Sequence, residues 1–208
     1  FSNIPKSGLM GVEKEPYADT MLCPNSKKAI LRSCGAGIAA ADDLMKQNER
    51  VFCAIRPPGH HAETTKAMGF CFVNNIAVTA KYLQDKYKVN KIAIIDFDVH
   101  HGNGTQEIFY NDKTVLYASS HEFPLFPGTG SEQETGVGNI FNAPLKNGTK
   151  GKEFLKIFDQ KILRPIDKFK PEVILISAGF DAHVRDPLAN INLESEDFYQ
   201  ITKSIVDL

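Results

Sequence analysis

The stretch KIAIIDFDVHHGNGTQ, residues 91–106, joins a strand-forming apolar run to a cluster of ligating side chains. Its first part, KIAIIDFD, is the kind of apolar segment that is buried on both faces of a parallel sheet. Asp96, Asp98, His100 and His101 stand at the end of that run. Buried carboxylates are costly unless a partner compensates their charge. We therefore expect a cation at the end of this strand.

The rest of the chain alternates between strand and helix patterns. Further apolar strands are predicted at VFCAIR (51–56), TVLYASS (114–120) and EVILISAG (172–179). Helices are predicted over 27–47, about 75–87 and around 152–169 (interrupted near Pro165) and near the C-terminus, with Ser26 and Ser195 as caps, whereas residues 1–25 read as loop. The alternation predicts one α/β domain over residues 1–208 with a mainly parallel central sheet. Because the chain begins at Phe1 and stops at Leu208 inside a predicted helix, we expect a domain that is incomplete at both ends.

Composition narrows the class of protein. The chain has 208 residues, 42% hydrophobic and 24% charged, with a net charge of −1. These values argue against disorder and a membrane span, and the charges form no basic patch for direct nucleic-acid binding. The four cysteines form no CxxC pair. We interpret them as buried thiols in a reducing compartment, the cytoplasm, or the nucleus in a eukaryote.

The polar residues gather where predicted strands end, which is the edge at which open parallel sheets bind ligands. His60 and His61 follow the first strand, and Asp181 follows the last. In an extended chain, Asp98 and His100 would point the same way, about 6.5 Å apart. With Asp181 they form a His and two carboxylates, a set that leaves positions open as catalytic sites do and that suits Zn²⁺, with Fe²⁺ as the alternative. We interpret His183 and Asp186 as loop groups.

Five motifs together resemble the zinc-dependent histone deacetylase family. They are RPPGHHAE (56–63), MGFCFVNN (68–75), DFDVHHGNGTQ (96–106), FPGTG (126–130) and SAGFDAH (177–183). The forms PPGHH and HHGNG are most similar to its class II and bacterial branch, which includes acetylpolyamine amidohydrolases. The resemblance implies the arginase/deacetylase fold, a three-layer α/β/α arrangement around a mainly parallel central sheet. It also implies a hydrolase that releases acetate from an N-acetyl amide, on protein lysines such as those of histones or on a polyamine.

The resemblance also implies roles for individual residues. Asp98, His100 and Asp181 match the zinc ligands, and His60 and His61 match the tandem catalytic histidines. Asp96 and Asn103 match the residues that hydrogen-bond those histidines. Gly69, Phe70 and Phe126 match the acyl-lysine channel. A potassium ion is implied at the carbonyl groups of Asp96, Asp98 and His100, with Ser119, and His101 is expected to be structural.

The different partners of the two histidines suggest different roles. Asp96 should hold His60 as a cationic stabiliser, whereas the uncharged Asn103 should leave His61 neutral near pH 7 and able to act as general base and then acid. The family's oxyanion-stabilising tyrosine or histidine has no matching motif here, so we expect these 208 residues alone to be inactive. Two alternatives stay open: an arginase-like hydrolase with two manganese ions, and a metal-binding interaction module without catalysis. The physiological substrate and the oligomeric state cannot be read from the residues.

Overall fold

A computed structural model describes residues 10–11 and 19–208. The chain packs as two compact units. One contains the chain up to Val89 together with Asn103–Ile108, and the other contains Asn90–Gly102 and Phe109–Leu208. The single-domain prediction stays a prediction, and each unit is described by itself.

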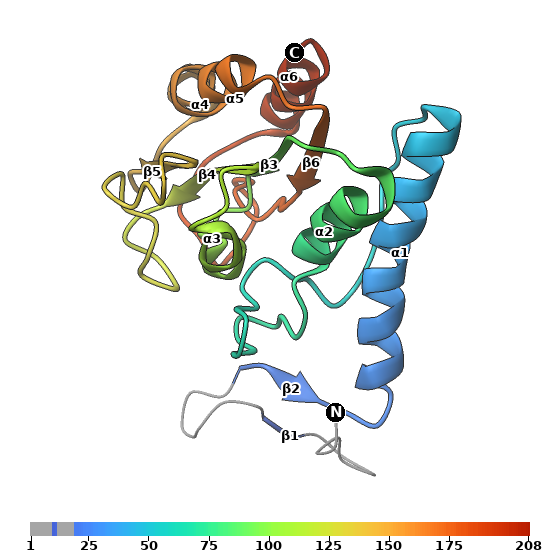
Figure 1. The fold of residues 1–208 in the computed structure, drawn as a ribbon. Coiled ribbons are helices and arrows are strands. Elements are labelled where there is room, and N and C mark those ends of the chain that lie inside the picture. The colour runs from blue at the N-terminus through green and yellow to red at the C-terminus, as the bar shows by residue number, and fades with distance from the viewer. Residues whose placement is uncertain (1–9, 12–18) are drawn as a thin grey trace. The chain divides into compact units, whose positions relative to one another are not determined.

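The second unit is built on a four-stranded sheet with the order β5-β4-β3-β6 (Figure 1). Its strands are β3 (Ile92–Asp96), β4 (Val115–Glu122), β5 (Ile140–Leu145) and β6 (Val173–Ser177). Every neighbouring pair is parallel, as predicted. The register sets Asp96 beside Ser119 on β4 and Ser177 on β6. The carboxyl ends of β3 and β6 therefore lie level with one another, whereas β4 continues to Glu122.

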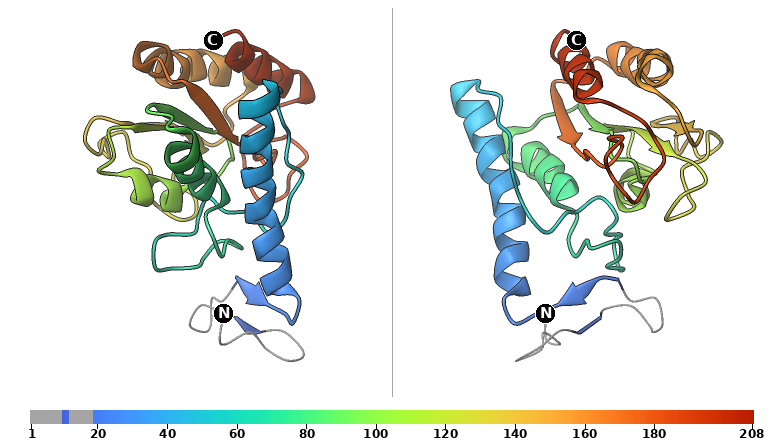
Figure 2. Two further views of the ribbon diagram at one scale, coloured as in Figure 1. Left: turned by 45° about the vertical axis from the view of Figure 1, so that its right-hand side comes forward. Right: turned by 180° about the vertical axis from the view of Figure 1, so that it is seen from behind.

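Helices cover one face of this sheet. Figures 1 and 2 show α4 (Gly151–Phe158), α5 (Arg164–Phe169) and α6 (Ser195–Val206) on the same side. Between α4 and α5 lies a π-helical turn, η1 (Asp159–Leu163), next to Pro165, which lacks the N–H that a regular helix needs. The core between sheet and helices is formed by buried apolar side chains, among them Ala93, Ile95, Leu116, Phe154, Phe158, Ile162, Ile166, Phe198 and Ile201.

The first unit contains two packed helices, α1 (Ser26–Gln47) and α2 (Asn75–Tyr87), which lie side by side in Figures 1 and 2. Asn74 caps α2, because its side chain accepts a hydrogen bond from the backbone N–H of Ala77 at 3.1 Å. A short helix, α3 (Asn103–Phe109), begins in this unit, and β1 (Met10–Gly11) pairs with β2 (Met21–Leu22) in an antiparallel ladder.

These observations confirm the α/β class and the parallel sheet. The third helical layer of the predicted arrangement would have to come from the first unit, so that part stays a prediction. The sequence patterns did not indicate α3 or β5. The segment 51–56 is no strand, because a strand needs a ladder partner and this segment has none among the described residues. Residues 10–11 and 21–22 correct the loop expected over 1–25, of which 1–9 and 12–18 lie outside the described residues.

Smaller expectations also need correction. The N-caps are Asn25 and Glu194 rather than Ser26 and Ser195, each of which is the first residue of its helix. Glu194 forms a capping box with Asp197, which satisfies two backbone N–H groups at the start of α6. Of the cysteines, Cys71 is buried, whereas the other three are half-buried.

Over the described ranges, the structure contains no helix long and apolar enough to span a membrane.

Candidate active site

Asp98, His100 and Asp181 converge on one point in the second unit. One ligating atom from each residue lies within 4.8 Å of the others, and all three residues are half-buried. His100 Nδ1 is 3.1 Å from Asp98 Oδ1 and 2.9 Å from Asp181 Oδ2. Among the residues whose placement is described, this is the one group of three or more His, Cys, Asp or Glu side chains close enough to share a metal ion.

A bend in the chain produces this convergence. The strand β3 ends at Asp96, so the extended spacing expected for Asp98 and His100 does not apply. Instead, Asp98 Oδ1 accepts a hydrogen bond from the backbone N–H of His100 at 2.9 Å, which turns both side chains to one place. Asp181, in the loop after β6, is fixed by a hydrogen bond of 3.0 Å from the backbone N–H of Val99 to its Oδ1. The two strand ends therefore position all three groups through main-chain contacts.

The electrostatics of the cluster favour a positive charge. Burial lowers the pKa of His100, but hydrogen bonds and charge from Asp181 and Asp98 outweigh burial and raise that pKa to about 10. Two carboxylates thus stabilise a cation between them. One imidazole and two carboxylates are ligands that Zn²⁺ and Fe²⁺ accept, and three protein ligands leave further coordination positions for water or substrate. The donor set therefore fits a catalytic metal ion.

Asp96 differs from its neighbours, because it is fully buried. Its Oδ1 accepts a hydrogen bond from the backbone N–H of Asp98 at 3.2 Å, and its Oδ2 accepts one from the Tyr117 hydroxyl at 3.1 Å. Burial and the charge of Asp96 raise the pKa of Tyr117 well above its usual value, so the phenol stays a donor. Ser119 lies beside Asp96 across the ladder, as a shared potassium site would require. The expected bond from Asp96 to His60 involves the other unit and stays a prediction.

The histidine pair belongs to the first unit. His60 and His61 are buried, with ring centroids 4.0 Å apart. The backbone carbonyl of His60 accepts hydrogen bonds from the N–H groups of Gly104 and Thr105, at 3.0 and 3.2 Å, in the first turn of α3. The short helix α3, which follows β3 in sequence, therefore holds the backbone at His60.

His61 has the partner that the resemblance implies. Its Nδ1 lies 2.8 Å from Asn103 Oδ1. Because an amide oxygen can only accept a hydrogen bond, Nδ1 carries the proton and the neutral ring has its lone pair on Nε2. That tautomer leaves Nε2 as the nitrogen able to take a proton. The catalytic role of His61 stays a prediction.

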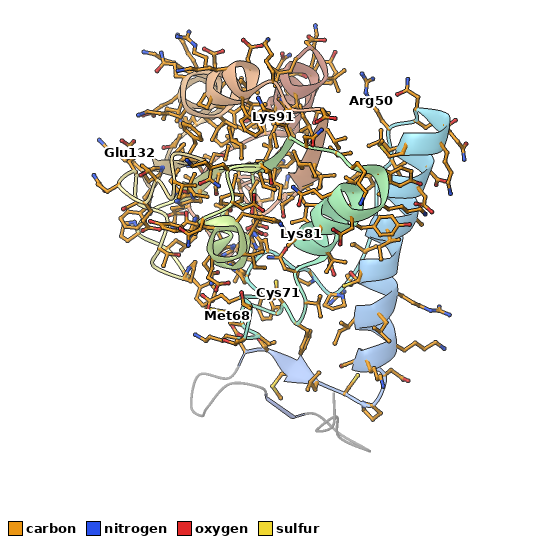
Figure 3. The ribbon with its side chains drawn as sticks, in the orientation of Figure 1. Arg50, Met68, Cys71, Lys81, Lys91 and Glu132 are labelled. Carbon is orange, nitrogen blue, oxygen red and sulfur yellow. The ribbon has the colours of Figure 1, made fainter. Side chains whose placement is uncertain are left out.

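Gly69 and Phe70 lie at the tip of a tight turn whose ends, Met68 and Cys71 (labelled in Figure 3), exchange backbone hydrogen bonds of 3.1 and 2.9 Å. Gly69 has a φ of +56°, and a Cβ atom there would overlap the His61 ring, so this position requires glycine. Phe70 has a φ of +63°, which is rare for an aromatic residue, and its side chain is exposed. Such strain is typical of functional positions.

Phe126 lies in the second unit, on the loop between β4 and β5. Its ring packs edge-on against His100, with centroids 6.4 Å apart, and it is exposed. It thus stands beside the ligand cluster. That Phe70 and Phe126 together line one channel stays a prediction, because they belong to different units.

The loop between β4 and β5 is anchored by two buried histidines, His101 and His121. His101 Nδ1 is 2.7 Å from Thr129 Oγ1, and His121 Nε2 donates to the Gly130 carbonyl at 2.9 Å. Burial lowers the pKa of His121 to about 4, so the ring is neutral and its Nδ1 accepts from the Ser119 hydroxyl at 2.9 Å. His101 therefore contacts the loop through Thr129, and its structural role stays a prediction.

His183 and Asp186 lie outside the ligand cluster. His183 stacks on Phe198, and its Nδ1 accepts a hydrogen bond of 3.1 Å from the backbone N–H of Arg185. The Asp186 carboxylate accepts one of 2.9 Å from the backbone N–H of Leu188. Both side chains therefore stabilise their own loop.

Comparison with known proteins identifies the class. The family model described as the histone deacetylase domain matches residues 3–208. A relative from Archaeoglobus fulgidus described as a probable deacetylase is 43% identical over 183 residues, covering 86% of this chain and 51% of that protein. The chain therefore belongs to the histone deacetylase domain family.

Solved structures agree with this assignment. The HDA15 HD domain has a TM-score of 0.88 and 38% identity, covering 92% of this chain and 58% of that one. An acetylpolyamine aminohydrolase from Burkholderia pseudomallei has a TM-score of 0.86 and 31% identity, covering 90% and 56%. The fold is consistent with the arginase/deacetylase superfamily, and the chain spans between half and two thirds of the length of these three relatives.

Sequence reasoning missed three residues near the site. Glu63 contacts the side chain of Asn103, Tyr117 contacts Asp96, and Thr20 accepts a hydrogen bond of 3.0 Å from the backbone N–H of Phe70. Glu63 is part of the motif RPPGHHAE, but its spacing in the sequence did not indicate a contact with Asn103, which is 40 positions away. Only the folded chain brings these groups together.

Proposed function

We propose that the protein is a zinc-dependent deacetylase that hydrolyses N-acetyl amides to the free amine and acetate. The observation that carries the proposal is the convergence of Asp98, His100 and Asp181 within 4.8 Å in a member of the histone deacetylase family. The chemistry that a divalent ion bound by these residues supplies is Lewis-acid polarisation of the amide carbonyl and of water. Iron(II) is the alternative ion for this donor set.

The reaction breaks the amide C–N bond and adds the oxygen of water to the acetyl carbon. In the proposed mechanism, Nε2 of His61 takes a proton from the attacking water and returns it to the departing amine nitrogen. Its tautomer, set by Asn103, supports this assignment. His60 lies beside it and would stabilise negative charge as a cation.

The substrate side of the proposal rests on the exposed aromatic residues. An acetylated lysine or polyamine has a thin apolar stem, which an exposed flat ring such as that of Phe70 or Phe126 can bind, and Gly69 leaves room next to His61. We propose an acetylated protein or an acetylpolyamine as substrate and a cytoplasmic location. A potassium ion at the carbonyl groups of Asp96, Asp98 and His100, with Ser119, completes the proposed site.

The alternatives have less support. Two manganese ions would need additional ligands, and the side chains of His183 and Asp186 are engaged in their own loop. An interaction module without catalysis would keep the metal site, so metal binding alone does not test for it. Turnover does.

The test uses the full-length protein, purified with its metal content measured. We expect about one zinc-type ion per chain and release of acetate from an acetyl-lysine peptide or from an acetylpolyamine, assayed side by side. Two metal ions per chain would favour the manganese alternative. A metal-loaded protein that hydrolyses neither substrate would refute the proposed activity.

A further inference from the structure

The Asn103 amide has two different ends in two different environments. Its Oδ1 faces His61 Nδ1 at 2.8 Å, whereas its Nδ2 faces Glu63 Oε1 at 2.7 Å. Two weaker acceptors lie farther from the same nitrogen, Met68 Sδ at 3.4 Å and the His61 carbonyl at 3.5 Å. The shortest contact of the NH₂ group is therefore with a carboxylate.

This arrangement fixes which way the amide points. A carboxylate can only accept hydrogen bonds, so the Glu63 side chain requires the NH₂ end of Asn103. Hydrogen bonds to an ionised group are stronger than neutral ones, so this contact dominates the choice of rotamer. The other end, Oδ1, is then directed at His61 and can only accept. The proton of the neutral ring must lie on Nδ1.

The loop holds Glu63 in place for this contact. The backbone N–H of Glu63 donates to the Lys66 carbonyl at 2.9 Å, closing a short turn after the histidines. The next residue, Thr64, donates from its backbone N–H and its hydroxyl to Glu107 Oε2, at 3.0 and 2.7 Å. The turn is therefore anchored to α3 by Glu107, separately from the bond between Glu63 and Asn103.

We propose that Glu63 is a positioning residue that, by orienting the Asn103 amide, sets the tautomer of His61 and keeps Nε2 as its proton acceptor. If the amide turned over, its NH₂ group would donate to Nδ1, and the proton of the neutral ring would move to Nε2. A base with its proton already on the working nitrogen cannot accept another. The effect on turnover rests on the proposed function, but the tautomer itself does not.

Substitutions at Glu63 separate the orientation of the amide from general loop stability. Glu63→Ala removes the strong acceptor and should leave a mixture of both orientations. Glu63→Lys offers only a donor, which should attract Oδ1 and reverse the amide. Glu63→Gln can still accept through its amide oxygen and should keep the original tautomer. Glu107→Ala is the matched control, because it loosens the same turn without touching Asn103.

The main measurement is ¹⁵N NMR of the imidazole nitrogens at neutral pH, in which the protonated and unprotonated nitrogens of a neutral ring have well-separated shifts. The protein has six histidines, and His61→Gln identifies the signals of His61 by their loss. We expect Nδ1–H in the wild type, in Glu63→Gln and in Glu107→Ala. Glu63→Ala should show both tautomers, and Glu63→Lys mainly Nε2–H. Circular dichroism establishes that each variant is folded.

Turnover of the metal-loaded protein gives the second readout. Equal tautomers would lower kcat about 2-fold in Glu63→Ala, and a reversed amide in Glu63→Lys would lower it by about 10², the lower end of the contribution of general base catalysis. KM should change little. A His61 ring that keeps Nδ1–H in folded Glu63→Ala and Glu63→Lys would overturn the proposal. If those variants shift the tautomer but the wild type hydrolyses no N-acetyl amide, the proposed function fails and the positioning role of Glu63 stands.

Discussion

Gly179→Ala is expected to damage the metal site through a steric clash alone. Gly179 lies in the loop between β6 and Asp181, against the end of β3. A Cβ atom at this position would overlap the carboxylate of Asp98 and lie 2.6 Å from the Asp98 Cα atom. The carboxylate could rotate away, but the Cα atom belongs to the backbone and cannot.

The magnitude follows from ordinary contact distances. Carbon atoms in contact lie about 3.5–4.0 Å apart, so the two strand ends must separate by about 1 Å. Overpacking of this kind lowers the free energy of unfolding by about 1–3 kcal/mol. For a chain of this length, each kcal/mol lowers Tm by about 2–4 °C. Because Asp98 and Asp181 are on opposite sides of the clash, we also expect zinc affinity to fall by about 10- to 100-fold, as when the support of metal ligands is disturbed.

The assay combines urea unfolding with zinc titration of the metal-free protein by calorimetry. The matched control is Gly35→Ala in α1, where a Cβ atom meets nothing within 4 Å. Alanine there should stabilise the helix by about 0.5–1 kcal/mol and leave zinc affinity unchanged. Wild-type stability together with wild-type zinc affinity in Gly179→Ala would refute the close-approach argument.

Three further outcomes are expected. Asp98→Ala or Asp181→Ala should abolish stoichiometric metal binding while the circular dichroism of an α/β fold persists. The control is Asp186→Ala, which removes a nearby carboxylate outside the cluster and should leave the zinc content unchanged. Normal zinc content in either ligand variant, measured by elemental analysis, would contradict the assignment. In the active protein, His61→Ala should lower kcat by about 10²–10⁴ because the proton acceptor is lost, and His60→Ala should lower it less; the reverse order in steady-state kinetics would exchange their roles. Asn103→Asp places a carboxylate beside His61, which favours the imidazolium form and raises the pKa of His61. The rising limb of the pH–rate profile should therefore move to higher pH. A profile that overlays that of the wild type would argue against His61 as the base.

Local patterns in the sequence predicted much of this fold. The apolar runs at β3, β4 and β6 and the helices α1 and α2 were visible because apolar runs and helical periodicity depend on residues close together in the chain. Burial on both faces holds for β3 and β4, whereas β6 is only partly buried and its Ile176 is exposed. The strand β5 and the helix α3 were not visible. β5 contacts η1 and α4, which follow it in sequence, and α3 begins within the motif DFDVHHGNGTQ, for which no helix was predicted.

For the site, the sequence by itself determined the residue types: an imidazole and carboxylates at the ends of predicted parallel strands, which already implied a cation. It did not determine how they meet. A bend stabilised by a hydrogen bond from the His100 N–H to Asp98, rather than strand alternation, brings the ligands together. The orientation of the Asn103 amide could not be predicted from the sequence either, because Glu63 and Asn103 are 40 positions apart. A linear pattern does not indicate which end of an amide faces which partner. Hydrogen-bond geometry between distant segments exists only once the chain has folded, and at this site that geometry decides which nitrogen of His61 can accept a proton.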